Sequence, residues 1–97
     1  MGFHAKNRTL VAANEVQGAT VYDRTGDHLG WIDDIVIDRK TGNVSYAVMS
    51  SGGFLGFGAR YHSLPWSMLN YDAALGGYLI NVERAQLEGA PAVGRWL

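Results

Sequence analysis

With 97 residues the chain is long enough for one domain, and its 47% of apolar residues can fill one core without metal ions or disulfides. Eight basic against nine acidic side chains leave a net charge of −1, which gives no support to direct nucleic-acid binding or to docking on an anionic membrane. The absence of cysteine excludes disulfides, thiolate nucleophiles and cysteine-bound metals, and it fits a cytoplasmic location.

The two chain ends are predicted as tails around a single domain. Residues 1–8 are expected to form a flexible N-terminal tail, residues 9–92 the domain and residues 93–97 a C-terminal tail. The N-terminal tail lacks the apolar stretch of a signal peptide. No apolar run approaches the ~20 residues that a membrane-spanning helix needs, so we expect no membrane insertion.

Short apolar runs between glycine-containing turns predict strands rather than helices. The first strand is Ala19 to Asp23, and the sequence DRTGD at its end predicts a tight turn. In such a turn an aspartate accepts backbone N–H groups and a glycine supplies a positive φ. The second strand is Gly30 to Asp38. Its isoleucines change parity at Asp33 and Asp34, which predicts a β-bulge.

The loop at residues 38–42 (DRKTG) is predicted to close a hairpin, with Gly42 in the left-handed conformation. The third strand follows and ends near residue 50. Its larger apolar side chains share one parity, and we assign that face to the core because alternate residues of a strand point to the same side. This predicted core face consists of Val44, Tyr46 and Val48, opposite Ala47 and Met49.

The second half of the chain continues the strand pattern. A fourth strand, Arg60 to Leu64, ends at Pro65, and a final hairpin joins Met68–Tyr71 to Gly77–Val82. One helical turn is predicted at Arg84–Glu88, and we expect Leu87 to plug the barrel that the strands form. These elements predict an all-β fold: a small six-stranded β-barrel, closed or nearly closed, with one short C-terminal helix.

Three segments together resemble the PRC-barrel family, which is named for the photosynthetic reaction-centre H subunit and shared with the C-terminal domain of the ribosome-maturation factor. They are residues 21–38 (VYDRTGDHLGWIDDIVID), residues 52–66 (GGFLGFGARYHSLPW), and residues 77–80 (GYLI) with 87–91 (LEGAP). The resemblance implies a six-stranded barrel that serves as an adaptor, because the reaction-centre version contacts neighbouring subunits and the ribosome-factor version contacts a ribosomal protein. It also implies a homodimer, a common form of stand-alone members.

Enzyme chemistry finds little support in the residue pattern. Ser63 lies beside His62, but neighbours in a strand point to opposite faces, so they cannot pair as nucleophile and base. Asp33 and Asp34 are separated in the same way unless the bulge brings both to one side. The histidines have no metal-ligand spacing, and we expect them to be solvated: His4, His28 and His62. The sequence therefore predicts no catalytic residue, no metal site and no cofactor.

The loop at residues 51–58 (SGGFLGFG) is unusually apolar for a loop. Four glycines among residues 52–58 allow sharp turns, while Phe54, Leu55 and Phe57 exceed what a solvated loop carries. These side chains either fold back to cap one end of the barrel or pack on another subunit or partner. Trp66 and Trp31 are the next candidates for an interface.

The leading hypothesis is a non-catalytic, cytoplasmic protein-interaction or adaptor module that forms a homodimer through this glycine-rich loop. The partner protein cannot be identified from the residues. An alternative is a small-ligand-binding or RNA-associated barrel, since small barrels such as OB-folds bind nucleic acid. The alternative is weakened by charge, because Arg39 and Lys40 cluster in one hairpin without a basic stripe. Direct nucleic-acid binding is not expected.

Overall fold

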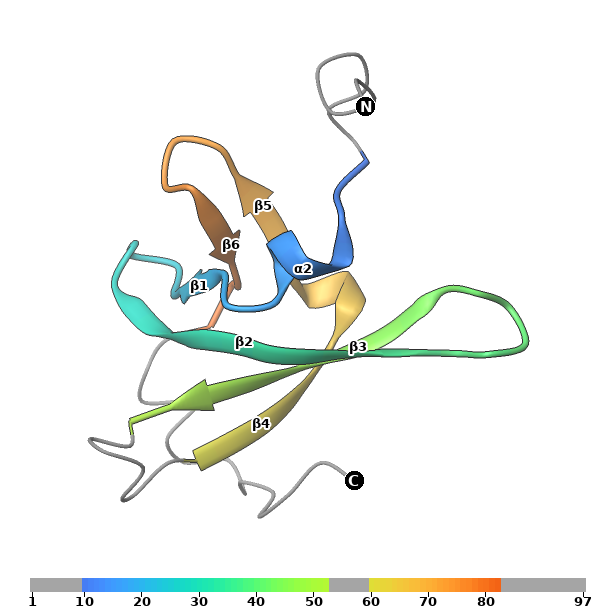
Figure 1. Ribbon diagram of the computed structural model, residues 1–97. Helices are drawn as coiled ribbons and strands as arrows, with labels where there is room; N and C mark the ends of the chain where they lie inside the picture. The colour runs from blue at the N-terminus through green and yellow to red at the C-terminus, as the bar shows by residue number, and fades with distance from the viewer. Residues whose placement is uncertain (1–9, 53–59, 83–97) are drawn as a thin grey trace.

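The computed structural model describes residues 10–52 and 60–82 and arranges six strands in one sheet (Figure 1). The strand order is β4-β3-β2-β1-β6-β5. A short helix, α2, precedes β1, and a 3-10 turn, η1, joins β4 to β5. The bounds are α2 Ala13–Val16, β1 Thr20–Tyr22, β2 His28–Ile37, β3 Val44–Ser51, β4 Arg60–Pro65, η1 Trp66–Met68, β5 Asn70–Asp72 and β6 Gly77–Leu79.

One parallel pair, β1 with β6, joins an antiparallel half of the sheet (β4, β3, β2 and β1) to the antiparallel hairpin of β6 and β5. Figure 1 shows β5 and β6 rising from the layer formed by β2, β3 and β4. Buried side chains of both parts form one core: Val16, Val21, Leu29, Ile32, Ala47, Met49, Leu64, Leu69, Tyr78 and Ile80.

The all-β, six-stranded prediction is confirmed, but the ladder does not close within the described residues. β4 and β5 are the two ends of the strand order, and no pairing joins them. The chain leaves β4 at Pro65 and turns through η1 before β5 begins, so consecutive strands lie at opposite edges of the sheet. The predicted helix at residues 84–88 and both predicted tails, residues 1–8 and 93–97, lie outside the described residues.

The turn after β1 forms as predicted, around the carboxylate of Asp23. The backbone N–H groups of Thr25 and Asp27 each donate to Asp23 Oδ1 at 2.9 Å, and Thr25 Oγ1 donates to the same atom at 2.6 Å. Gly26 closes the turn at a φ of +89°. These hydrogen bonds explain how an aspartate can be buried at the end of the sheet.

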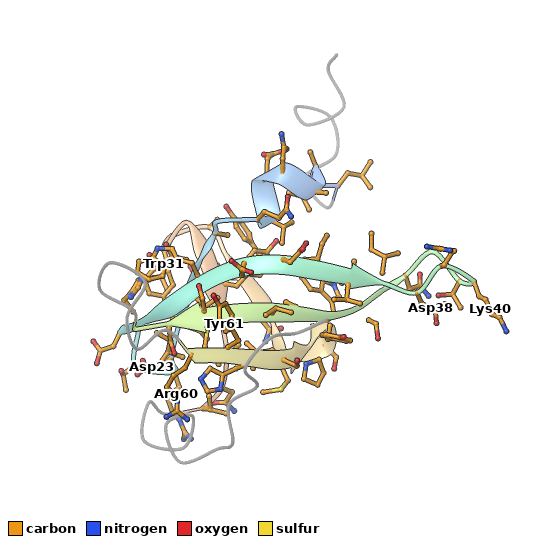
Figure 2. The ribbon with its side chains drawn as sticks, turned by 60° about the horizontal axis from the view of Figure 1, so that its bottom comes forward. Asp23, Trp31, Asp38, Lys40, Arg60 and Tyr61 are labelled. Carbon is orange, nitrogen blue, oxygen red and sulfur yellow. The ribbon has the colours of Figure 1, made fainter. Side chains whose placement is uncertain are left out.

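The β2–β3 hairpin repeats this chemistry at Asp38. Asp38 Oδ1 accepts the backbone N–H groups of Lys40 at 2.8 Å and Thr41 at 3.3 Å, and Gly42 has the predicted left-handed conformation at a φ of +79°. Figure 2 shows Asp38 and Lys40 at the far tip of this hairpin and Trp31 near the other end of the sheet. The basic residues of the hairpin therefore lie well away from the rest of the domain.

The predicted bulge in β2 is present, and it determines which side chains enter the core. The register with β3 shifts between Ile32 and Asp34, so Asp33 is the extra residue. Ile32 is fully buried, and Ile35, three positions later, also packs against the core. Without the extra residue these two isoleucines would point to opposite faces of the sheet.

The predicted core face of β3 is wrong. Ala47 and Met49 belong to the core cluster, whereas Val44 and Tyr46 are only half-buried on the opposite face. The register explains the error, since Ala47 pairs with Leu64 of β4, another core residue. Val48 is buried as well, outside the core cluster. Because the strand carries buried residues on both faces, side-chain size could not identify the core side.

Helix α2 was not predicted. It is a single turn in which Val16 is buried in the core, and Glu15 Oε1 accepts the backbone N–H of Ala12 at 3.2 Å. Glutamate three residues after a helix start is a recognised N-terminal signal, but four residues show no helical periodicity. The strand positions in the second half agree better with expectation: β4 ends at Pro65 on the sheet edge, and β5 and β6 form the predicted hairpin with shorter strands.

His62 is buried rather than solvated, which corrects the sequence-based expectation. Only 5% of its surface is exposed, and it shares the core face of β4 with Leu64 and pairs with Met49. Burial, and then the positive charge of Arg60, lower the pKa of this histidine below its ordinary value of 6.5. The folded chain therefore favours the neutral form of this imidazole more than the unfolded chain does.

Gly30 of β2 packs tightly against the backbone of β3, and this generates the first prediction. A Cβ at this position would stand 2.2 Å from the backbone oxygen of Ser50, so the two strands would have to separate. We expect Gly30→Ala to lower the free energy of unfolding by about 1–3 kcal/mol. Urea denaturation measures the change, with exposed Ser63→Ala on β4 as the control. Equal stability of the two variants would contradict the close approach.

The second prediction concerns pH. Below about 6.5 the unfolded chain binds a proton at His62 while the folded chain resists it, so the free energy of unfolding should fall as the pH drops. Urea denaturation at pH 7.5 and 5.5 should show a larger fall for the wild type than for His62→Leu. The exposed His28→Gln variant is the control and should behave as the wild type does. The same pH dependence in all three proteins would overturn this interpretation.

Candidate functional site

An open groove of about 750 Å³ lies between α2, η1 and the β5–β6 hairpin. Figure 1 shows these three elements on one side of the layer formed by β2, β3 and β4. The lining is mostly apolar and aromatic: Leu10, Val11, Glu15, Ala19, Trp66, Leu69, Tyr71, Ala73, Gly76 and Tyr78. The described lining thus comes from two separate stretches of the chain, residues 10–19 and 66–78, and it is assembled only in the folded domain.

Three aromatic rings form the wall of the groove. Trp66 and Tyr78 have ring centroids 5.7 Å apart at an interplanar angle of 55°, and Tyr71 and Tyr78 have centroids 5.4 Å apart at 68°. Tyr71 and Tyr78 are direct partners in the β5–β6 pair, while Trp66 is placed by η1, where the N–H of Leu69 donates to the Trp66 oxygen at 3.1 Å. Regular backbone hydrogen bonding therefore positions all three rings.

The rim of the groove is exposed and apolar. Tyr71 is 63% exposed, Leu10 52% and Val11 48%. Tyr78, by contrast, is buried and belongs to the core cluster, and Trp66 packs partly against it. An aromatic wall with an exposed apolar rim has the composition expected of a binding surface rather than of an ordinary solvated face.

Among the described residues of the lining, Glu15 is the single charged one. It projects from α2, and its carboxylate is oriented by the hydrogen bond from the Ala12 N–H. The pKa of Tyr78 is raised, first by burial and then by the negative fields of Tyr71 and Glu15. The groove is consequently an environment that disfavours added negative charge.

The structure places the predicted interface residues apart. Trp66 lines the groove, but Trp31 does not. Trp31 is 45% exposed on the face of β2 that points away from the core, and its ring lies 4.6 Å from that of His28, centroid to centroid. Phe54, Leu55 and Phe57 lie outside the described residues. Their assignment to an interface stays a prediction.

Several groove residues were not singled out by sequence reasoning. Tyr71 and Tyr78 pair across the predicted last hairpin, but nothing in the sequence indicated that Glu15 and Leu10 would join them. Residue 15 is distant along the chain from residues 66 and 78. Their proximity depends on the parallel pairing of β1 with β6, which single-sequence patterns do not reveal.

The residues considered for catalysis are not assembled into a site. His62 is buried while Ser63 is exposed, in agreement with the predicted alternation. Asp33 is exposed, whereas Asp34 is half-buried and accepts the side-chain amide of Gln17 at 3.0 Å and the N–H of Ile35 at 2.8 Å. Within residues 10–52 and 60–82, no three histidine or acidic side chains gather as metal ligands would. Neither helix of this part of the chain could cross a membrane.

Comparison with known proteins supports the sequence resemblance. The search of curated proteins gave no match. Among solved structures, a Pseudomonas aeruginosa protein assigned as the 16S ribosomal RNA processing protein RimM aligns with a TM-score of 0.50 and 19% identity. The alignment covers 77% of this chain but 45% of that one, so the chain spans less than half the length of this neighbour.

At this identity the structural likeness concerns the fold alone, and RimM carries a PRC barrel as its C-terminal domain. The family itself is established by a match along the sequence. The model of the PRC-barrel domain covers residues 8–87, a span that includes every described strand. The chain therefore belongs to the PRC-barrel family.

Proposed function

We propose that this chain is a non-catalytic protein-interaction module of the cytoplasm that binds an extended segment of a partner protein in the groove between α2, η1 and the β5–β6 hairpin. The observation that carries the proposal is the exposed apolar rim beside the aromatic wall of the groove. Burying Tyr71 and Val11 against a partner would remove apolar surface from water, which is the main favourable term in protein association.

The kind of side chain in the groove also supports a protein partner. Tyrosine and tryptophan are enriched at the energetically dominant positions of interfaces, because they offer large contact areas and lose little conformational entropy. In this groove the rings are already fixed by the β5–β6 pairing and by η1. Binding would therefore order few protein groups, which lowers the entropic cost of association.

An extended segment is favoured by the position of β5. This strand forms one end of the strand order, and only β6 pairs with it among the described residues. A peptide lying in the groove would run beside an edge strand, an arrangement in which backbone groups can add hydrogen bonds to side-chain contacts.

The RNA-associated alternative is less well supported at this site. The printed name of the RimM structure refers to 16S ribosomal RNA processing, which is a statement about that protein. Phosphate contacts are made mainly by lysine and arginine, and neither occurs among the lining residues that fall within 10–52 and 60–82. The non-catalytic part of the proposal rests on the alternation of β4, which buries His62 and exposes Ser63, so these neighbours cannot pair as base and nucleophile.

The third prediction tests recognition by the groove. Peptides selected from a random display library on the wild-type protein should bind the Val11→Ser, Tyr71→Ser double variant at least tenfold more weakly, because both side chains belong to the rim. Ile37→Ser is the matched control, since Ile37 is equally apolar and 53% exposed but does not line the groove. Affinity is measured by isothermal titration calorimetry.

Two results would count against the proposed function. Failure of the wild type to enrich any peptide over an unrelated folded domain would contradict a peptide-binding role. An equal loss of affinity in the Ile37→Ser control would show that the selected peptides bind somewhere other than the groove.

The fourth prediction concerns self-association, which we propose occurs through the glycine-rich loop. Light scattering at tens of micromolar should give a mass about twice the 10.6 kDa of one chain. The Phe54→Ser, Phe57→Ser double variant should give the monomer mass at unchanged stability, because the apolar contact would be lost. A monomeric wild type would refute self-association, and a dimeric variant would exclude the loop as its interface.

A further inference from the structure

We propose that residues 83–97, which lie outside the described residues, fold back across the outer face of the sheet and cover Val48. The outer face is the side of β2, β3 and β4 that points away from the core, and it includes Trp31, Tyr46, Val48, Ser50, Tyr61 and Ser63. The inference concerns the side of the sheet opposite the groove, so it stands or falls independently of the proposed function.

Val48 is fully buried although it points away from the core. Its neighbours along β3, Ala47 and Met49, both belong to the core cluster, and successive side chains of a strand point to opposite sides. Its partner in β4 is Ser63, which is exposed. Val48 is nevertheless 0% exposed, as completely buried as Ala47 on the core side. Atoms outside the core therefore cover this valine.

The elements that cover the sheet elsewhere lie on its other side. Val16 of α2, Leu69 after η1 and Tyr78 of β6 share the core cluster with Ala47 and Met49, so these elements pack on the core side. Figure 1 likewise shows them on one side of the layer formed by β2, β3 and β4. The layer over Val48 is thus a separate one.

The neighbouring side chains of the outer face do not explain complete burial. Side chains stand roughly perpendicular to a sheet, so Tyr46 and Tyr61 flank Val48 rather than roof it. The second face of an antiparallel sheet is commonly solvated, and Trp31 on this face is 45% exposed. Because Val48 is buried within a single chain, the missing layer belongs to the chain itself.

Residues 83–97 begin at a suitable place. Val82 directly precedes them, and its carbonyl oxygen accepts the N–H of Arg24 at 3.3 Å, in the turn after β1. Figure 2 shows Asp23 of the same turn at the end of the sheet where Arg60 lies. The segment therefore leaves the described part of the chain at the end of the sheet where β4 begins and β3 ends.

The reach and the composition of the segment also fit. Val48 lies three residues from Ser51, the partner of Arg60, which is about 10 Å along β3. An extended segment of the length of residues 83–97 spans about 50 Å. It carries large apolar side chains at Val93, Trp96 and Leu97. Packing them on the outer face would remove apolar surface from water on both sides of the contact.

The two other segments outside the described residues are less well placed. Residues 1–9 precede Leu10, which lines the groove on the opposite side of the layer. Residues 53–59 join β3 directly to β4 and must return to the sheet, so they extend over it by about three residues, or about 10 Å. That length just attains Val48 and leaves no further residue to cover it.

The test uses the full chain with Val48→Cys as the reporter. The natural sequence has no cysteine, so the rate of alkylation by iodoacetamide measures access to position 48 alone. Adding Val93→Ser, Trp96→Ser and Leu97→Ser should raise this rate by about tenfold or more, because the cover would open locally. Ala47→Cys in the same two backgrounds is the matched control. It faces the core, and its rate should stay unchanged.

Each other result overturns the inference. Fast alkylation of Val48→Cys in the otherwise unchanged chain would show an open face, and slow alkylation in both backgrounds would show shielding by Tyr46 and Tyr61. An increase caused instead by Phe54→Ser with Phe57→Ser would assign the cover to residues 53–59. An equal increase for Ala47→Cys would show a general loss of stability. None of these results alters the peptide selection, which probes the opposite side of the sheet.

Discussion

One extra residue in β2 is the constraint on which the rest of this domain depends. The bulge at Asp33 turns Ile32 and Ile35 toward the same core and leaves Asp34 able to accept the side chain of Gln17, directly after α2. That hydrogen bond and the burial of Val16 hold the helical turn against β2. A regular strand would send one isoleucine to the opposite face and remove the anchor of α2.

The groove is a consequence of this anchoring. α2 is too short to persist as an isolated helix, so its place is set by contacts with the sheet. With α2 fixed, Glu15 stands opposite the rings of η1 and the β5–β6 hairpin. The bulge in one strand thereby places a carboxylate beside aromatic residues more than fifty positions away along the chain.

Sequence reasoning succeeded where the chemistry is local. The aspartate-centred turns at Asp23 and Asp38 and the parity change in β2 involve residues within a few positions of one another, so their patterns are readable. Sequence reasoning failed where long-range strand pairing determines which residues are buried. The buried face of β3 follows from its register with β4, and the burial of His62 follows from its position opposite Met49. The groove belongs to this second kind, because the parallel β1–β6 pair brings its segments together.

The groove and the core share residues in this domain, which limits how the groove can vary. Tyr78 is both a core residue and the centre of the aromatic wall, and Trp66 packs on the core while it lines the groove. A change in either would alter folding together with binding. Tyr71, Val11 and Glu15 are exposed instead, so they can change without opening a cavity. If the groove binds different partners within a constant fold, specificity would therefore reside in these three exposed positions. Tyr78 and Trp66 would stay constant, because they pack against the core.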